Sequence, residues 1–148
     1  MRHVRIDPAE GPFEERPGCP EGVCVREQMS CPAVVVAAGA TIAEALRLMA
    51  DHRIHYLPVV DDSAALVGIV NADDLLGTRR PGPARAEVVA AVMSAPVVTI
   101  GPAEPLAGAM RLMADRRLGA LPVIEGGRLV GMLTQSDVVT AVARQESA

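Results

Sequence analysis

The chain has 148 residues, of which 50% are hydrophobic, and its formal net charge is −4. This length suits one compact domain or two small units that share a core, and no apolar run approaches the ~20 residues of a membrane-spanning helix. The acidic balance argues against a nucleic-acid binder that works by bulk electrostatics, because such a protein needs a basic face. Aromatic residues are almost absent, so Tyr56 is the only expected stacking partner for a flat ligand besides Phe13 in the leader.

Residues 1–23 are expected to form a leader without regular structure, because prolines at positions 8, 12, 17 and 20 interrupt it. The segment has no apolar centre of the kind found in a signal peptide. Three cysteines lie in or close to this leader, at Cys19, Cys24 and Cys31. Their odd number and the missing secretory signal favour reduced thiols and a cytoplasmic protein, with a Cys19–Cys24 disulfide as the alternative.

The first half of the chain after the leader alternates strand and helix patterns. Thr41 and Glu44 have the spacing of a capping box, and the apolar positions that follow predict an amphipathic helix to about His52. Pro58 indicates that its strand is an edge strand or contains a bulge. The other expected elements are a helical turn over 25–29, strands over 33–36, 54–60 and 66–70, and a helix that starts at 71–74 and reaches Leu76.

The second half shows the same order after a Gly- and Pro-rich linker. Pro105 suits the first position of a helix, and Gly108 weakens that helix. The expected elements are helices over 85–93, 106–117 and 134–144 and strands over 97–100, 120–124 and 129–133.

The two halves repeat each other over most of their length. The offset is 64 residues up to the Leu-Pro-Val motif and 63 after it, so one residue is missing in the following turn. The matching segments are 29–32, 47–51, 57–59 and 66–68 in the first half and 93–96, 111–115, 121–123 and 129–131 in the second.

The repeat predicts an α/β (mixed α+β) fold of two β-α-β-β-α units. Three strands and two helices bury too little surface alone, so we expect the copies to pack sheet to sheet about a pseudo-two-fold axis. The expected division is a leader over 1–23, a first repeat over 24–77, a linker over 78–86 and a second repeat over 87–144.

The doubled pattern resembles a tandem pair of CBS domains, the Bateman module. The resemblance rests on Leu57–Asp61, Leu66–Val70 and Gly131–Asp137 and covers roughly residues 25–143. In that family such pairs bind AMP, ADP, ATP or S-adenosylmethionine in clefts between the repeats, usually form dimers and regulate another protein. The resemblance therefore implies a homodimeric regulatory module with an adenosine nucleotide as ligand, no required cofactor, and an unidentified regulated protein as partner.

The family's nucleotide motif, Gly-hydrophobic-x-Thr/Ser-x-x-Asp, is matched fully in the second copy by Gly131, Met132, Thr134 and Asp137. A carboxylate can accept the hydroxyl protons of a ribose, and a helix start offers free backbone N–H groups to an anion. Met132 is the methionine that the motif places near a base.

The first copy has an altered form of the motif, because Asn71 replaces the Thr/Ser while Asp74 is kept. Residues 52–59 resemble the phosphate-contacting segment of the nucleotide-sensing subunit of AMP-activated protein kinase. By that match His55 stands at the position of a phosphate-contacting histidine, and Tyr56 replaces a basic residue. The corresponding positions of the second copy are Gly119 and Ala120.

We therefore expect two unequal clefts, of which the better one combines Thr134 and Asp137 with His55 and Tyr56 from the other copy. The simpler alternative is that both Thr/Asn-x-x-Asp motifs are only helix caps. A ligand-free dimerisation scaffold and an S-adenosylmethionine sensor are the alternative functions. An enzyme is not expected, because no nucleophile–base pair, paired carboxylates or metal cage is evident, and neither catalytic nor metal-binding residues are assigned.

Overall fold

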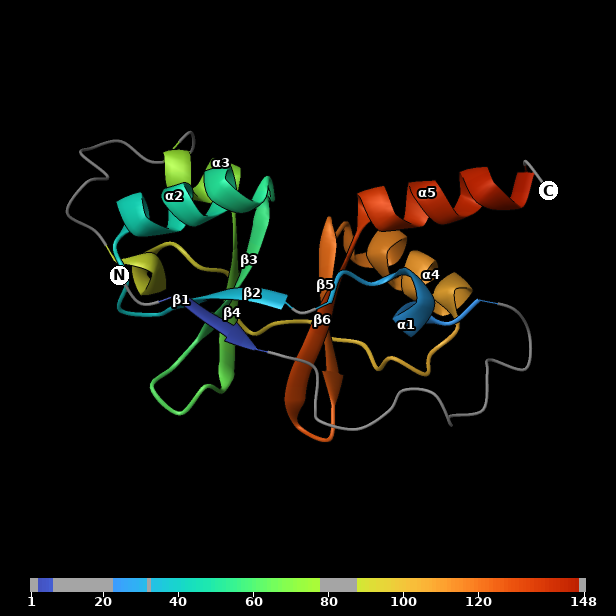
Figure 1. The fold of residues 1–148 in the computed structure, drawn as a ribbon, viewed down its shortest axis with the longest axis horizontal. Helices are drawn as coiled ribbons and strands as arrows, with labels where there is room; N and C mark the ends of the chain where they lie inside the picture. The colour runs from blue at the N-terminus through green and yellow to red at the C-terminus, as the bar shows by residue number, and fades with distance from the viewer. Residues whose placement is uncertain (1–2, 7–22, 32, 78–87, 147–148) are drawn as a thin grey trace. The chain divides into compact units, whose positions relative to one another are not determined.

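The computed structural model describes residues 3–6, 23–31, 33–77 and 88–146 (Figure 1). These residues form two compact units. Unit 1 comprises the described residues of 1–6 and 34–97, and unit 2 comprises those of 7–33 and 98–148.

Unit 1 is built on a sheet with the strand order β1-β2-β3-β4. Strand β2 pairs with β3 in parallel, and β3 pairs with β4 in an antiparallel hairpin. Its elements are β1 (His3–Ile6), β2 (Ala33–Ala37), α2 (Ile42–His52), β3 (Tyr56–Val60), β4 (Leu66–Asn71), α3 (Ala72–Leu76) and the 3-10 helix η3 (Val89–Ala91). The order β2-α2-β3-β4-α3 is the one that the sequence predicts.

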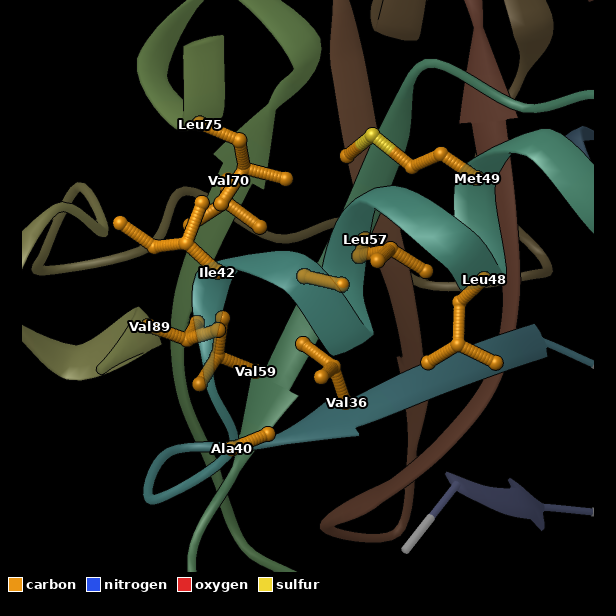
Figure 2. Close-up of a cluster of buried hydrophobic side chains, with 11 residues drawn as sticks. Val36, Ala40, Ile42, Leu48, Met49, Leu57, Val59, Val70, Leu75 and Val89 are labelled. Carbon is orange, nitrogen blue, oxygen red and sulfur yellow. The ribbon is translucent and has the colours of Figure 1, made fainter. Parts of the chain in front are cut away.

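Helix α2 begins where the capping box places it. The Thr41 Oγ1 accepts a hydrogen bond from the Glu44 N–H at 3.1 Å, and the Glu44 carboxylate accepts one from the Thr41 N–H at 3.0 Å. The apolar face of α2 packs with β3, β4 and α3 into the core of unit 1, shown in Figure 2. The core residues labelled there are Val36, Ala40, Ile42, Leu48, Met49, Leu57, Val59, Val70, Leu75 and Val89.

Unit 2 has a two-stranded sheet in place of the four-stranded one. Its elements are α1 (Val25–Gln28), α4 (Leu106–Arg116), β5 (Ala120–Glu125), β6 (Arg128–Thr134) and α5 (Gln135–Glu146). Its core consists of Val25, Leu106, Ala109, Met113, Leu121, Val123, Val130, Leu133 and Ala141. The β-β hairpin and both flanking helices of the second copy are therefore confirmed.

Two predicted features of the backbone differ from the structure. The strand expected over 97–100 is reduced to one bridge, in which Ile100 pairs in parallel with Val123. Of the helix expected over 85–93, the described part contains only η3. The N–H groups of Val89 and Ala90 donate to the carbonyls of Ala40 and Ala38 instead of helical partners, at 2.8 and 3.0 Å.

The start of the chain differs as well. Strand β1 forms ahead of the first proline, although the sequence predicts no regular element there. Cys24 is disulfide-bonded, which contradicts the expectation of a reduced thiol at this position, and Cys31 is exposed. Cys19 and the linker 78–86 lie outside the described residues.

The first segment of each repeat packs into the unit formed by most of the other repeat. Residues 23–31, here named strap 1, lie at the start of the first repeat but contribute Val25 to the core of unit 2. Residues 88–94, here named strap 2, lie at the start of the second repeat but contribute Val89 to the core of unit 1. The compact units therefore do not coincide with the sequence repeats.

Candidate functional site

The second copy of the motif lies where strand β6 passes directly into helix α5. The Asp137 Oδ2 accepts two hydrogen bonds from Thr134, one from its N–H at 2.8 Å and one from its hydroxyl at 3.0 Å. The Thr134 Oγ1 in turn accepts a longer bond from the Asp137 N–H at 3.4 Å. This is a reciprocal helix cap, so the capping role of both residues is real.

The cap leaves part of the carboxylate available. Both side chains are partly exposed, and within the described part of the chain the Asp137 Oδ1 has no hydrogen-bond donor. The carboxylate is held in one orientation through Oδ2, at the positive end of the twelve-residue helix α5. Such a group can accept hydroxyl protons from a sugar while the helix start attracts an anion. We name Met132, Thr134 and Asp137 half-site 2.

The first copy of the motif repeats this reciprocal cap with one hydrogen bond fewer. The Asn71 Oδ1 accepts a bond from the Asp74 N–H at 2.8 Å, and the Asp74 Oδ2 accepts one from the Asn71 N–H at 3.4 Å. Both residues are partly buried, and they begin the five-residue helix α3. The replacement of Thr/Ser by Asn71 therefore preserves the cap but removes the hydroxyl that contacts Asp137 in the second copy.

His55 and Tyr56 lie beside Asn71 in the same unit. The His55 carbonyl accepts a hydrogen bond from the N–H of Ala72, the first residue of α3, at 3.0 Å. Tyr56 stands directly opposite Asn71 in the β3–β4 hairpin, so the two side chains share one face of the sheet. His55 is exposed and Tyr56 is partly buried. We name His55, Tyr56, Asn71 and Asp74 half-site 1.

Half-site 2 has the same backbone arrangement with small residues at these two places. The Gly119 carbonyl accepts from the Gln135 N–H at 3.1 Å, and Ala120 stands opposite Thr134. The two half-sites are therefore unequal. Half-site 1 has an imidazole and a phenol beside its cap, whereas half-site 2 has Gly119 and Ala120 beside a cap with a hydroxyl.

The predicted combination of His55 and Tyr56 with Thr134 and Asp137 joins residues of two units that are described separately, so it stays a prediction. The sequence analysis did not predict that Tyr56 lies opposite Asn71 within unit 1. Counting outward from the Val60–Leu66 pair places Tyr56 opposite Val70, and the bulge between Val59 and Val60 moves it opposite Asn71. The turn alone therefore does not give the partner, and the available signal was the bulge that Pro58 indicates.

Met132 lies in strand β6, two residues before Thr134, and its role near a base stays a prediction. It is 6% exposed but does not belong to the hydrophobic core cluster of unit 2. Alternation along β6 places its side chain on the same face of the sheet as Thr134. A thioether next to the cap would give half-site 2 an apolar, polarisable surface.

The described residues contain no group of three or more His, Cys, Asp or Glu side chains that could hold a metal ion. None of the helices found there is long and apolar enough to cross a membrane.

Two units that share the order helix-strand-strand-helix, each with a capped helix start behind a β-hairpin, define a tandem-repeat protein with one candidate half-site per repeat. The family model described as CBS domain matches residues 24–80 and again 89–144. The chain therefore belongs to the CBS domain family, as the doubled motif in the sequence indicates.

Relatives and solved structures of similar size agree with this assignment. A CBS domain-containing protein of Dictyostelium discoideum is 34% identical over 129 residues, which are 79% of this chain and 89% of that protein. The crystal structure of CBSX2 in complex with AMP has a TM-score of 0.72 and 28% identity, and the match covers 84% of this chain and 99% of the other. The CBS domain pair of protein MJ0100, in complex with 5′-methylthioadenosine and S-adenosyl-L-methionine, has a TM-score of 0.74 and 25% identity, with coverages of 83% and 98%.

Proposed function

We propose that this protein is a regulatory module that binds an adenosine nucleotide, AMP, ADP or ATP, and signals through a change of shape or of dimer contacts. The similar structures support the ligand class, because AMP, 5′-methylthioadenosine and S-adenosylmethionine share an adenosine group. A ligand can shift the population of two conformations only by its differential affinity for them. Catalysis is not part of the proposal.

The observation that carries the proposal is the orientation of the Asp137 carboxylate. Thr134 holds Oδ2 through two hydrogen bonds, so Oδ1 is presented in a fixed direction without a donor from the described residues. A ribose hydroxyl is a suitable donor, and a hydrogen bond to a charged acceptor contributes about 1.5–3 kcal/mol. Met132 is buried on the same face of the sheet as Thr134, and we expect its thioether to contact the base.

A nucleotide suits the half-sites better than S-adenosylmethionine does. The start of helix α5 favours a negative group, whereas the sulfonium of S-adenosylmethionine is positive. His55 in half-site 1 is an exposed hydrogen-bonding group that suits a phosphate. We therefore expect AMP or ATP to bind more tightly than S-adenosylmethionine.

A ligand-free scaffold is the second candidate, and one observation favours it. Both motifs are closed as helix caps by their own hydrogen bonds, so each is structurally satisfied without a ligand. Calorimetric titration of the full chain with AMP, ATP and S-adenosylmethionine separates the candidates. Saturable heat with AMP or ATP supports the sensor, and no heat with any of the three supports the scaffold.

A second copy of the chain is the proposed structural partner. Leu76 and Val139 are 60% and 67% exposed, and they hold the same position in the two repeats, two residues after Asp74 and Asp137. Exposed aliphatic side chains at matched positions suit a symmetric interface, which uses one patch from each subunit. Sedimentation of Leu76→Ser and Val139→Ser should show a weakened dimer, whereas Met110→Ser, another exposed apolar side chain, should not.

The regulated protein and the compartment are also part of the proposal. We expect a protein partner that senses the change of shape and no nucleic-acid or membrane partner, in keeping with the acidic charge. A cytoplasmic location is kept as a proposal, although the disulfide at Cys24 removes the thiol argument for it.

A further inference from the structure

The two straps share a sequence pattern and contact their hairpins in the same way. Both contain Val-x-x-x-Met-Ser, over 25–30 in strap 1 and over 89–94 in strap 2. The valine of each is fully buried in the core of the unit on which its strap packs. The serine exchanges two backbone hydrogen bonds with the hairpin, Ser30 with Met132 at 2.8 and 3.0 Å and Ser94 with Ile69 at 2.8 and 3.1 Å.

The first residues of the two straps also have equivalent partners. The Val25 N–H donates to the Glu104 carbonyl at 2.9 Å, and the Arg26 N–H donates to the Pro102 carbonyl at 3.0 Å. Strap 2 makes the same two bonds in unit 1, where each acceptor lies 64 positions before its counterpart in unit 2. The pattern is therefore held at its beginning and at its end in both units.

A glycine of the hairpin makes room for the methionine of the pattern. A Cβ placed on Gly131 would lie 2.7 Å from the Met29 sulfur and 2.8 Å from the Ser30 carbonyl oxygen. A Cβ on Gly68 would meet atoms of the Met93 side chain. Each hairpin therefore accepts a segment with a valine for the core, a methionine over the glycine and a backbone that bonds to the next residue of the strand.

The two straps differ in the length of chain between the segment and its hairpin. Ser94 lies 25 positions from Ile69, whereas Ser30 lies 102 positions from Met132. In sequence, residues 34–97 of the other unit separate strap 1 from the rest of unit 2. Closing a longer loop costs more entropy. A strap from another copy of the chain therefore competes better for the place of strap 1 than for the place of strap 2.

The contacts of strap 1 define a surface of unit 2, here named the strap seat, which consists of Pro102, Glu104, Gly131 and Met132. We propose that the strap seat is an interaction surface between two copies of this chain, in which each copy places strap 1 on unit 2 of the other. The exchange keeps every contact of strap 1, because segment and seat are identical in both copies, and the two reciprocal contacts close a symmetric dimer. Repeat proteins are known to exchange segments in this way.

This interaction goes beyond the proposed function, because it requires no ligand and does not use the exposed side chains of Leu76 and Val139. It also concerns half-site 2. Met132 belongs to this half-site and is bonded by the last residue of the strap pattern. In the exchanged dimer a segment of the second copy therefore supports half-site 2.

A disulfide between two chains tests the exchange. One full-length chain carries Ser30→Cys and the other carries Met132→Cys, and both carry Cys31→Ser so that the neighbouring thiol does not react. Residues that exchange both backbone bonds have Cα atoms about 5.5 Å apart, a distance that a disulfide spans. The chains are mixed, unfolded in urea, refolded together and oxidised, and a non-reducing gel measures the covalent dimer.

The matched control is the equivalent pair of strap 2, with Ser94→Cys in one chain and Ile69→Cys in the other. Because the separation along the chain is about fourfold longer for strap 1, we expect about eightfold more covalent dimer for the strap 1 pair than for the strap 2 pair. Dilution before refolding should lower the yield of the strap 1 pair, since the strap of the same chain then competes better.

Val25→Ser in the chain that carries Ser30→Cys is the control for chance proximity, because it removes the buried anchor of strap 1. A covalent dimer that exceeds the yield of the strap 2 pair and decreases with Val25→Ser supports the proposal. No covalent dimer, equal yields from the two pairs, or a yield that Val25→Ser leaves unchanged overturns it.

A second measurement decides the question if the cysteine variants do not fold or do not react within a single chain. The chain with Leu76→Ser and Val139→Ser, refolded at high protein concentration, should sediment as a dimer, and adding Val25→Ser should return it to a monomer. A monomer in the first of these variants, or a dimer in both, overturns the proposal. Neither experiment contains AMP, so a failure to bind AMP would affect the proposed function and not this interaction.

Discussion

Replacing Asp137 by alanine separates the two roles of this carboxylate, because one role predicts a loss of stability and the other a loss of affinity. The variant removes an acceptor of two hydrogen bonds from Thr134, at 2.8 and 3.0 Å. A lost cap contribution costs about 0.5–2 kcal/mol, and a lost negative charge at a helix start costs a further 0.3–1 kcal/mol. We therefore expect a destabilisation of about 1.5 kcal/mol, which lowers the Tm of a chain of this size by about 3–6 °C.

The expected loss of affinity for AMP is larger than the loss of stability, and a second variant serves as its control. Removing a charged acceptor from a ribose hydroxyl predicts a loss of about 1.5–3 kcal/mol, or about tenfold to a hundredfold in the Kd of AMP. Glu44→Ala is the matched control, because Glu44 caps α2 through a bond of 3.0 Å from Thr41 and belongs to neither half-site. This control should lose a similar amount of stability without a change in affinity.

The assays are thermal or urea unfolding for stability and calorimetric titration with AMP for affinity, both below the unfolding temperature of the variants. Equal AMP affinity in Asp137→Ala and the wild type would refute the assignment of Asp137 as a ligand residue. A similar loss of affinity in Glu44→Ala would show that stability, and not the lost contact, causes the effect. An unchanged Tm in Asp137→Ala would refute the capping role.

Three stability predictions use single positions in the two units, and urea unfolding measures all of them. Ala64 has a φ of 63°, whereas the corresponding turn of unit 2 contains Gly126 and Gly127 with positive φ. Ala64→Gly should therefore raise the free energy of unfolding by about 0.5–1 kcal/mol. A lower free energy of unfolding would mean that the turn does not strain alanine. A Cβ on Gly108 in α4 would meet nothing within 4 Å. Gly108→Ala should therefore raise the free energy of unfolding by about 0.5–1 kcal/mol. A lower value would contradict an open helix surface at this position. Leu121 is fully buried in unit 2, so Leu121→Ala should destabilise by about 2–5 kcal/mol, and a loss below 1 kcal/mol would contradict its place in the core.

The helices and hairpins could be predicted from the sequence because local rules determine them. The capping box at Thr41 places the start of α2, and the apolar spacing that follows gives its length. The repeat then transfers the same elements to the second half, where the hairpin of β5 and β6 is found as expected. These signals lie within one element or one turn, so they do not depend on the rest of the fold.

The role of Pro58 could be predicted only in part. The bulge is confirmed as a register shift between Val59 and Val60, but β3 is not an edge strand, because it lies between β2 and β4. Pro58 stands opposite Ile69, whose N–H and carbonyl bond to Ser94 of strap 2, so β4 requires no N–H from the proline. Pairing with β2 begins only at Val59. The proline is tolerated in an inner strand because of a partner 36 positions away.

The arrangement of half-site 1 and the packing of the straps also depend on contacts between residues that are far apart in the sequence. His55 and Tyr56 resemble a phosphate-contacting segment, but nothing in those eight residues tells which cap they join. The hairpin register decides this, by placing Tyr56 opposite Asn71. For the straps, the local pattern predicts a short helical segment before each repeat and does not identify the repeat on which it packs.

The reciprocal straps explain why the repeat occurs twice in one chain. The contact of Met29 with Gly131 is the same as that of Met93 with Gly68, and each buries a valine of one repeat in the core formed by the other. A single repeat would have a strap without a hairpin to pack on and a hairpin without a strap. A second copy supplies both, and the covalent link gives the two copies a fixed, high effective concentration. The stability of each unit therefore depends on a segment that belongs to the start of the other repeat.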